Sequence, residues 1–495
     1  MTRFLPMQLK HWTGGELRQT GKHAADSERY YPSISTDTRT LLAGQVFVPL
    51  RGDLYDGHAF LDAAAEKGAG MLVIESGARE LAAWLSRLER DQDAPDLLLV
   101  EDAGAAFRDM ARGFRSTLAA TVIGVTGSVG KTTTRRMICQ MIETQVKAEQ
   151  SARNFNNQVG LPRTILATRP DTQVLVAEMG MARRGEIRIL SAITVPDIAI
   201  ITQIGMSHAE WLGSMNDILA EKTSITAGMK ENGLLIVNGD DPLLESWVLQ
   251  DPPSVPVWFT ASEQNAGRLE RGGFPVFWSE HVRVDRQGLS FTGRSNLAPD
   301  ERWPVYLKLP ARHLIPAALF GLATVYAMGL NMQEAAASAR RFTTADSRQE
   351  LIRVGSIDVM DDSYNASPES LHSALETASF LAEGNRRLVM VLGGLKELGR
   401  YSDQVHEEAA LELLEAGVDR VILVGAETVR TREHLLADGR GAAMVAGWYE
   451  TCQEAIPAVL SELEPGDFLL LKASRFYELD KIGEALQHAG LEREH

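Results

Sequence analysis

The segment GVTGSVGKTTT (124–134) constrains the fold more than any other part of the chain. An apolar β-like run leads into it and an amphipathic helix leaves it, which is the setting of a phosphate-binding loop (P-loop). Gly127 and Gly130 let backbone N–H groups turn toward phosphate oxygens, and the helix N-terminus adds partial positive charge. Lys131 supplies a point charge, and the Thr132 hydroxyl can ligate Mg²⁺. A plain glycine turn is the alternative, but the Gly-Lys-Thr at the helix start favours a nucleotide site.

Short apolar strands alternate with helices along the chain, in three groups. At 495 residues the chain is too long for one ordinary core. Because the strands are apolar throughout and follow a strand-turn-helix order, we expect parallel sheets covered on both faces. The sequence therefore predicts an α/β protein of three domains, the last of them Rossmann-like. The predicted domain bounds are 1–118, 119–341 and 342–495. The central domain carries a predicted β-rich extension at 255–309.

The uncharged stretch 314–333 is long enough to span a membrane. Pro316 stands where a helix would begin, and glycines and polar residues dilute the apolar run, so we predict a buried packing helix instead. The start of the chain has no apolar segment typical of a secretory signal. With Cys139 and Cys452 as the only cysteines, a disulfide framework and a thiolate metal cluster are excluded. We expect a cytoplasmic monomer with no membrane insertion.

The charge balance excludes one broad class of partner. Lys and Arg number 50 against 66 Asp and Glu, for a net charge of −16. No net positive field exists to attract nucleic acid or an anionic membrane. A local phosphate site remains compatible, since it needs only a few well-placed donors.

Three polar residues lie near the ends of predicted strands after the P-loop. Glu178 ends an apolar run, His208 follows the next one, and Lys222 lies further on in a predicted helix. Taken singly, each is more often a solvated or structural residue than a functional one. Together they fall around the carboxyl ends of strands in one sheet, where such folds bind ligands.

These residues resemble the ATP-dependent Mur ligases of bacterial cell-wall precursor synthesis. The TGxxGKT loop, Glu178, His208 and Lys222 match the family's central domain in order and spacing. The N-terminal segments STDTR (35–39) and FVPLRGDLYDGHAF (47–60) are similar to the family's UDP-sugar-binding domain. Further similar strings point to the branch that adds D-alanyl-D-alanine: NFNNQVGLP (154–162), EMGMARRGEI (178–187), ITQIGMSHAEWLGS (201–214), NGDDP (238–242), DDSYNASPES (361–370) and GGLKELGRYSDQVHE (393–407). The diaminopimelate-adding branch would instead show an Asn/Asp-rich proline-arginine motif in its last domain.

Several positions depart from the family's usual motifs. Val125 stands for the glycine of the general P-loop pattern, and Gly394 for a common aspartate. Ala311 and Leu314 replace the glycine and asparagine of a Gly-Arg-His-Asn motif, and Ala473 replaces the glycine of Lys-Gly-Ser-Arg. The departures at Ala311, Leu314, Gly394 and Ala473 bear on the amine pocket and the interdomain hinge rather than on the phosphate chemistry, whereas Val125 makes the P-loop the shorter TGxxGKT form.

The resemblance implies an ATP-dependent amide ligase. It would add D-alanyl-D-alanine to UDP-N-acetylmuramoyl-tripeptide through an acyl-phosphate, giving ADP and phosphate; whether the third residue of the acceptor is lysine or diaminopimelate stays open. Thr132 and Glu178 are implied to hold one Mg²⁺, and His208 with Glu178 a second. The family implies that Lys222 is carbamylated by CO₂. Carbamylation needs the neutral amine, which burial would favour.

Further ligand contacts are implied by the same resemblance and come from all three predicted domains. Lys131, Lys222, His208 and Glu178 are the implied catalytic group. The implied ATP contacts are Thr126, Gly127, Ser128, Val129, Gly130, Lys131, Thr132, Asn154, Asn156, Arg348, Tyr364 and Asn365. Asp37, Thr38 and Arg39 are implied for the uridine diphosphate, and Lys472, Ser474 and Arg475 for the dipeptide carboxylate. Ser367 and Pro368 are predicted instead to begin a helix, as N-cap and first residue.

Other functions remain open at this point. One is a related ligase with another acceptor or amine. Another is a P-loop ATPase or switch without ligase activity, which would need Lys131 and Thr132 but has no use for Glu178, His208 and Lys222 together. A paralogue that binds both nucleotides without turnover is a third.

Overall fold

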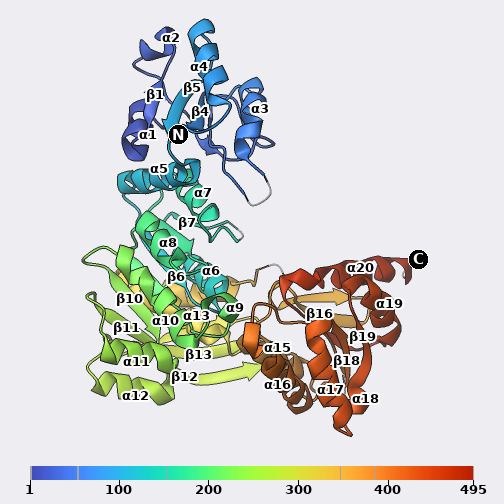
Figure 1. Ribbon diagram of the computed structural model, residues 1–495. Coiled ribbons are helices and arrows are strands. Elements are labelled where there is room, and N and C mark those ends of the chain that lie inside the picture. Colours follow the sequence, from blue (N-terminus) through green and yellow to red (C-terminus); the bar gives the residue numbers. More distant parts are fainter. Residues whose placement is uncertain (1–2, 53–54, 153, 346, 385, 494–495) are drawn as a thin grey trace.

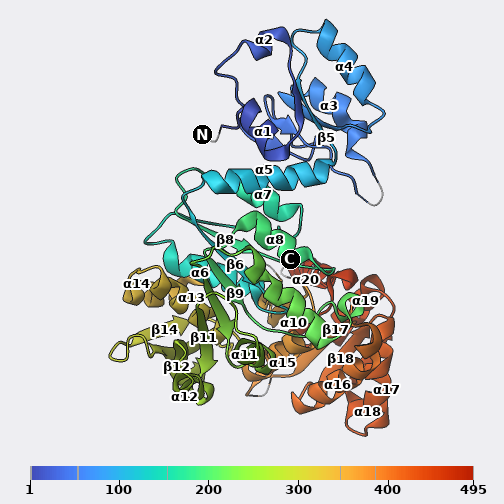
Figure 2. The ribbon, with the colours of Figure 1, turned by 60° about the vertical axis from the view of Figure 1, so that its left-hand side comes forward.

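The computed structural model describes residues 3–52, 55–152, 154–345, 347–384 and 386–493. Three separate β-sheets follow one another along the chain, each with helices packed against it, which confirms the predicted α/β fold of three units (Figure 1). The N-terminal unit lies at one end of the molecule. Its last helix packs against two helices of the central unit, and the C-terminal unit lies beside the central one (Figures 1 and 2).

The N-terminal sheet has the strand order β1-β5-β4-β3-β2, and only β1 runs antiparallel to its neighbour. The apolar strands β4 and β5 are buried throughout, because helices and neighbouring loops cover both faces. The strands are β1 (Glu16–Arg18), β2 (Ile34–Ser35), β3 (Val46–Phe47), β4 (Met71–Glu75) and β5 (Asp96–Val100). The helices are α1 (Pro6–Thr13), α2 (Gly21–Ala24), η1 (Gly57–Phe60), α3 (Leu61–Glu66), α4 (Leu81–Arg90) and α5 (Ala103–Thr117).

The central sheet has nine strands in the order β14-β13-β12-β11-β10-β9-β6-β8-β7. All neighbours from β7 to β12 are parallel. The strands are β6 (Thr121–Thr126), β7 (Ala148–Gln150), β8 (Val174–Glu178), β9 (Ile198–Ile201), β10 (Leu234–Asn238), β11 (Val257–Ser262), β12 (Val276–Asp285), β13 (Gly288–Ser295) and β14 (Trp303–Leu307). The chain leaves β6 toward β7 and β8 on one side and returns to β9 on the other, so a ligand crevice is expected at the carboxyl end of β6.

Among the described residues, nine α-helices and one 3₁₀ turn lie between β6 and the end of α14. They are α6 (Lys131–Ile142), α7 (Gly160–Ala167), α8 (Glu186–Thr194), α9 (Ala209–Leu212), α10 (Met215–Thr223), η2 (Ser224–Gly228), α11 (Pro242–Gln250), α12 (Glu263–Arg271), α13 (Leu314–Ala327) and α14 (Met332–Ser338). The short turn η3 (Ala339–Arg341) follows them.

The predicted β-rich extension at 255–309 is part of the central sheet itself. Its first strand, β11, continues the parallel order, and α12 connects it to β12, which is parallel to β11. β13 then pairs antiparallel with β12, and β14 pairs antiparallel with β13. The uncharged stretch from Leu314 forms α13, most of whose residues are buried against α6 and the extension, as the prediction of a packing helix required. In the described part of the chain, no helix is long and apolar enough to cross a membrane.

The C-terminal sheet has the order β15-β16-β20-β17-β18-β19, with only β15 antiparallel. The sequence predicted the four inner strands but neither edge strand. Its strands are β15 (Glu350–Val354), β16 (Ile357–Asp362), β17 (Leu388–Gly393), β18 (Arg420–Val424), β19 (Val445–Tyr449) and β20 (Phe468–Lys472). Its helices are α15 (Pro368–Ala382), η4 (Gly399–Tyr401), α16 (Ser402–Glu415), η5 (Ala426–Thr428), α17 (Val429–Ala437), α18 (Gly441–Met444), α19 (Cys452–Glu462), η6 (Arg475–Tyr477) and α20 (Asp480–Arg493).

Helix α15 begins as the sequence predicted. Ser367 is the N-cap, and its hydroxyl accepts a hydrogen bond from the Ser370 amide at 3.3 Å. Pro368 is the first helical residue, where its missing N–H costs nothing. The strand tip before this cap is thereby held in place at the carboxyl edge of the sheet.

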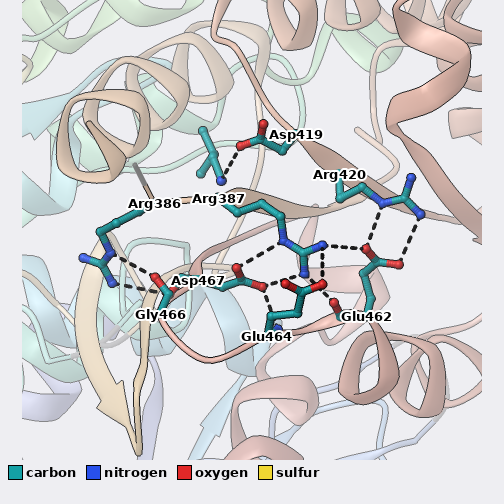
Figure 3. Close-up of polar contacts among 9 residues, drawn as sticks. Arg386, Arg387, Asp419, Arg420, Glu462, Glu464, Gly466 and Asp467 are labelled. Carbon is teal, nitrogen blue, oxygen red and sulfur yellow. Dashed lines mark hydrogen bonds and ion pairs between the residues drawn. The ribbon is translucent and has the colours of Figure 1, made fainter. Parts of the chain in front are cut away.

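The opposite edge of the C-terminal sheet is closed by charged side chains that satisfy one another (Figure 3). Arg387 Nε donates to Asp467 Oδ1 at 3.1 Å, and Arg420 Nε donates to Glu462 Oε1 at 2.8 Å. The Asp419 carboxylate accepts from the amide that begins β17. This network joins the amino ends of three strands, which leaves the carboxyl ends as the edge open to ligands.

Candidate functional site

The P-loop connects β6 to α6 and depends on two glycines with positive φ. Gly127 has φ +145°, and a Cβ there would lie 2.0 Å from the Thr202 hydroxyl oxygen. Gly130 has φ +84° and caps α6, which begins at Lys131. The Lys131 ammonium donates to the Gly127 carbonyl at 2.7 Å and to the Ser128 carbonyl at 3.0 Å. The lysine side chain therefore lies folded along the loop.

Neighbouring strand ends hold the loop in shape. The Ser128 amide donates to the Gln203 carbonyl at 2.7 Å, and its hydroxyl donates to the Gly205 carbonyl at 3.0 Å. The Thr202 hydroxyl donates to the Val129 carbonyl at 2.5 Å. The Thr126 hydroxyl donates to the carbonyl of Met179, beyond the end of β8, at 3.0 Å. The loop is therefore preorganised by the segments that follow β8 and β9.

Glu178, at the end of β8, lies buried directly beside the P-loop. Its carboxylate accepts from the Thr132 hydroxyl at 2.9 Å, from Arg135 Nε at 3.2 Å and from Asn156 Nδ2 at 3.0 Å. Burial alone would raise the pKa of Glu178, but the nearby charges of Arg135 and Lys131 outweigh it and lower the pKa below its usual value. Glu178 is therefore an anion in the folded protein.

Lys222 is fully buried in α10, and its ammonium has no hydrogen-bond partner in the described chain. Burial, with the positive charge of Lys131 as a second cause, lowers the pKa of Lys222 well below its usual value, against the opposing effect of Glu221. Burial of this kind disfavours the charged ammonium and favours the neutral, nucleophilic amine. Desolvation also lowers the pKa of Lys131, to about 8, although Glu178 opposes the shift.

His208 is the N-cap of α9, with φ +66°, and lies where the central unit faces the C-terminal unit (Figure 1). Its Nδ1 is 2.5 Å from the Glu397 carboxylate of the C-terminal unit. Within the described chain, no hydrogen bond or ion pair joins His208 to Glu178 or Lys222, and no three His, Cys, Asp or Glu side chains are gathered as a ready metal site. The predicted metal ligands are thus near one strand edge but not assembled around one point.

A cleft of about 630 Å³ opens between the P-loop helix and the C-terminal unit. Arg348 lines this cleft and also two smaller cavities against the P-loop, of about 230 and 100 Å³. The Arg348 guanidinium stacks 4.1 Å from the centre of the Tyr364 ring. Among the residues that line the large cleft are Thr132, Arg135, Arg136, Asn154, Arg348 and Arg475. Positive charge from both units thus surrounds the place where phosphate is expected.

The predicted dipeptide contacts separate into two groups. Lys472 is fully buried, pairs with the Asp362 carboxylate at 2.7 Å and donates to the Asn365 carbonyl at 2.6 Å, so it fixes the strand tip that carries Tyr364 and Asn365. The Ser474 hydroxyl accepts from the Lys396 amide at 2.8 Å. Arg475 is more than half exposed, pairs with Asp480 at 3.1 Å, and lines the large cleft.

The predicted uridine diphosphate loop lies in the N-terminal unit, apart from the P-loop. Arg39 holds Asp37 in a two-point ion pair, with Nη2 2.8 Å from Oδ2, and lowers the pKa of Asp37 to about 2. The Thr38 carbonyl accepts from Lys67 at 2.7 Å. Arg39 remains mostly exposed, and Arg163 of α7 adds a weaker positive influence on Asp37. The loop therefore faces the central unit with an arginine able to meet an anion.

The structure adds residues to which the sequence assigned no role. Arg135 is buried against Glu178, and Glu397 contacts His208. His313 lines the 230 Å³ cavity, and burial together with the charge of Lys472 lowers its pKa to about 4. Arg135 stands three residues after Thr132 in the P-loop helix, a spacing that puts both side chains on one face and could have drawn attention to it. Glu397 lies in the string GGLKELGRYSDQVHE (393–407) that is similar to the family, but nothing in that string indicates that its partner is His208 of another unit.

The departures from the family motifs lie mainly in the cores. Ala311 and Leu314 are fully buried in the central core, and Ala473 in the C-terminal core. Ala473 fills the space beside Gly393, where an added Cβ would come within 2.5 Å of it. These substitutions therefore affect packing behind the cavities rather than the side chains that line them.

This combination of a P-loop in a parallel sheet, flanked by two further α/β units, defines a three-domain nucleotide-dependent enzyme. Residues 125–325 match the family described as "Mur ligase middle domain", and residues 347–475 match "Mur ligase, glutamate ligase domain". The chain belongs to the Mur ligase family, as its similarity to curated relatives also shows.

The relatives share a name and nearly the full length. UDP-N-acetylmuramoyl-tripeptide–D-alanyl-D-alanine ligase of Bacillus subtilis (strain 168) is 31% identical over 452 residues, which cover 91% of this chain and 92% of the relative. The Escherichia coli (strain K12) protein of the same name is 29% identical, with 92% and 94% covered.

Solved structures agree on the fold. MurF from Acinetobacter baumannii superposes with a TM-score of 0.84 at 23% identity over 99% of both chains. MurF ligase from Thermotoga maritima in complex with ADP gives 0.76 at 23% identity over 93% of this chain and 98% of that one.

Proposed function

We propose that this chain is an ATP-dependent ligase that adds D-alanyl-D-alanine to UDP-N-acetylmuramoyl-tripeptide in peptidoglycan precursor synthesis. The single observation that carries the proposal is the 31% identity over nine tenths of the chain with a ligase of that name. The geometry supports it, because the Thr132 hydroxyl of the P-loop contacts the buried anion Glu178, and the buried Lys222 lies close enough to Lys131 for their charges to interact.

The reaction requires one anion to attack another. The acceptor carboxylate must approach the γ-phosphate of ATP, after which the dipeptide amine displaces phosphate from the acyl-phosphate and forms the amide bond. Lys131 and Arg348 offer the positive charge that lowers this repulsion, one from the P-loop and one from the C-terminal unit. Because the two units meet over the cleft, their approach would also keep water from the acyl-phosphate.

Divalent Mg²⁺ fits the residues beside the P-loop. The Thr132 hydroxyl and the Glu178 carboxylate are 2.9 Å apart and offer the oxygen ligands that Mg²⁺ prefers. When bound there, the ion would neutralise phosphate charge. We propose His208 as a further protein ligand of Mg²⁺, from the side of the interface that carries the P-loop. Arg135 keeps the carboxylate of Glu178 ionised and in place.

Lys222 fits the proposed carbamate. Its buried amine lacks a hydrogen-bond partner in the described chain, and burial lowers its pKa and so favours the neutral form, which is the form that reacts with CO₂. Carbamylation would convert it from a cation that repels metal into a carboxylate-like anion. ¹³C NMR of the intact, active enzyme under ¹³CO₂ tests this: full activity without a carbamate signal would refute it.

Each unit would hold a different part of the ligands. We propose UDP-sugar binding by residues 1–118 through Asp37, Thr38 and Arg39, ATP binding by 119–341, and closure on nucleotide and amine by 342–495. The proposed ATP contacts run from Thr126 to Thr132 and include Asn154, Arg348, Tyr364 and Asn365. Asn156 would act through Glu178, to which it donates, and Ser474 and Arg475 would meet the dipeptide carboxylate while Lys472 supports their strand tip.

The test is ATP-dependent phosphate release with UDP-N-acetylmuramoyl-tripeptide and three amine conditions: D-alanyl-D-alanine, single D-alanine and none. We expect release only with the dipeptide, together with a pentapeptide product detected by mass. Acceptors with lysine and with diaminopimelate are run side by side. Phosphate release that ignores both peptide substrates would contradict the proposal and favour an ATPase.

A further inference from the structure

The segment that follows β9, Gly205–Glu210, contacts the C-terminal unit at three points. The Met206 amide donates to the Glu369 carboxylate at 3.0 Å, and the Met206 side chain packs against the C-terminal core. The Glu210 amide donates to the Glu397 carbonyl at 3.0 Å. His208 lies between these two attachments. Its backbone is therefore fixed from the C-terminal unit on both sides.

The third contact joins the two side chains. The Glu397 carboxylate lies 2.5 Å from His208 Nδ1, and this contact with His208 is the main reason why the pKa of Glu397 is lowered. The oxygen is not aligned with the ring N–H, since Nδ1 has no hydrogen-bond partner of good geometry in the described chain. Rotation of the Glu397 side chain about its own bonds would align them.

Both residues have left-handed backbones, with φ +66° at His208 and +65° at Glu397. Such conformations are unfavourable for side chains with a Cβ and gather at functional sites. Glu397 is nearly half exposed, and an ion pair with that exposure adds little to stability. Gly399, two residues on, has φ +54°, and a Cβ there would come within 2.9 Å of the Glu210 Cα. The local backbone is thus shaped to bring Glu397 to His208 rather than to gain stability.

We propose that Glu397 is a positioning residue for His208. By accepting from Nδ1–H, its carboxylate fixes the ring tautomer and leaves Nε2 as the nitrogen that can act as a ligand. Because Glu397 belongs to the C-terminal unit, the orientation of His208 depends on the docking of that unit. This inference rests on the proposed ligase function, in which His208 serves the phosphate site, and it couples domain docking to the assembly of that site.

The kinetic test uses two substitutions at one position and one control. Glu397→Ala removes the acceptor, and we expect kcat for dipeptide ligation to fall about 10- to 100-fold with KM for ATP nearly unchanged. Glu397→Gln keeps an oxygen acceptor and should recover most of kcat. Arg286→Gln is the matched control. The exposed Arg286 also donates a hydrogen bond across the interface, to the Glu383 carbonyl at 2.5 Å, but it lies in the β12–β13 turn, away from the proposed ligand residues.

The second readout does not depend on activity. Histidine-selective ¹⁵N NMR of the resting enzyme, with the His208 signal assigned by His208→Gln, reports the tautomer at a pH where the ring is neutral. We expect an Nδ1–H tautomer in the unsubstituted, Glu397→Gln and Arg286→Gln proteins, and a shift toward Nε2–H in Glu397→Ala.

The outcomes separate the possible failures. An unchanged His208 tautomer in Glu397→Ala would overturn the inference, whatever happens to kcat. Equal losses of kcat in Glu397→Ala and Arg286→Gln would also overturn it, because domain contact alone would then explain both. If the unsubstituted chain forms no pentapeptide product with D-alanyl-D-alanine, the proposed function fails. The NMR result still decides whether Glu397 orients His208.

Discussion

Replacing Gly127 by alanine should damage the P-loop far more than the same change at Gly130. A Cβ at Gly127 would lie 2.0 Å from the Thr202 hydroxyl oxygen, and real Cβ atoms do not approach another atom closer than 3.0 Å. The loop or Thr202 must therefore move by about 1 Å. A displacement of that size next to reacting groups can cost about 100-fold in rate, or about 2.7 kcal/mol.

Gly130→Ala is the matched control. Its φ of +84° makes alanine unfavourable, but the nearest atom to an added Cβ is 3.8 Å away, so only backbone strain remains. That strain is worth about 1 kcal/mol, which corresponds to a loss of roughly fivefold. The assay is kcat/KM for ATP in the coupled phosphate-release reaction, with thermal unfolding to confirm that each variant is folded.

Thr202→Ala completes the comparison. It removes the clashing oxygen, and the next atoms near a Gly127 Cβ are then 3.1 and 3.2 Å away, which a small shift accommodates. Thr202→Ala by itself loses the hydrogen bond to the Val129 carbonyl, at about 1 kcal/mol. We expect the double variant to be more active than Gly127→Ala alone. Equal kcat/KM for Gly127→Ala and Gly130→Ala, or no recovery in the double variant, would refute the close-approach argument.

Three further predictions concern charged residues. Lys222→Met should abolish ligation while binding of an ATP analogue, measured by calorimetric titration, changes only a few-fold. Depletion of CO₂ should inactivate the unsubstituted enzyme until bicarbonate is added, which the phosphate-release assay and ¹³C NMR of the intact enzyme under ¹³CO₂ check. The pKa of Lys131 in the folded protein is lowered to about 8, below its value in the unfolded chain. The affinity for ATP should therefore weaken as pH rises through 8, and the contribution of Lys131 to folding stability should increase between pH 8 and its unfolded pKa. A pH-independent affinity for ATP, or the same pH profile in Lys131→Met, would contradict this. Lys472→Met leaves the Asp362 carboxylate buried without its partner at 2.7 Å, at a cost of about 3–5 kcal/mol, and Lys472→Met/Asp362→Leu should recover part of the loss in thermal denaturation.

Much of the fold follows from local pattern, because the inner strands carry it themselves. β4, β8, β17 and β20 are buried at every position and are apolar except for the charged residue that ends β4 (Glu75), β8 (Glu178) and β20 (Lys472), a pattern that a sequence reveals directly. The edge strands differ. β15 (ELIRV) alternates between partly buried and exposed positions and contains Glu350 and Arg353, so it lacks the apolar run of a covered strand. β19 (VAGWY) is apolar but only partly buried, and Gly447 interrupts its run of larger side chains. Their pairing depends on the neighbouring strand, which local pattern does not contain.

The candidate site divides in the same way. The glycines, lysine and threonine of the P-loop are adjacent in the chain, and their spacing alone predicts a phosphate cradle. The partners of Glu178 and Lys472 come from distant segments, and the contact of His208 with Glu397 joins two units. The sequence places Lys472 at the end of a strand. Tertiary packing decides whether its side chain points into a cleft or pairs with a buried aspartate, and the sequence alone does not contain that information.

The measurement that tests the central claim most directly follows oxygen from acceptor to phosphate. UDP-N-acetylmuramoyl-tripeptide is labelled with ¹⁸O in the carboxylate that joins the dipeptide, and the phosphate released with D-alanyl-D-alanine is analysed by mass. If an acyl-phosphate forms, one carboxylate oxygen becomes the bridge to phosphorus and leaves with it, so we predict one ¹⁸O in each released phosphate. Phosphate without label would mean that ATP is hydrolysed by water, and the ligase account of this chain would be contradicted.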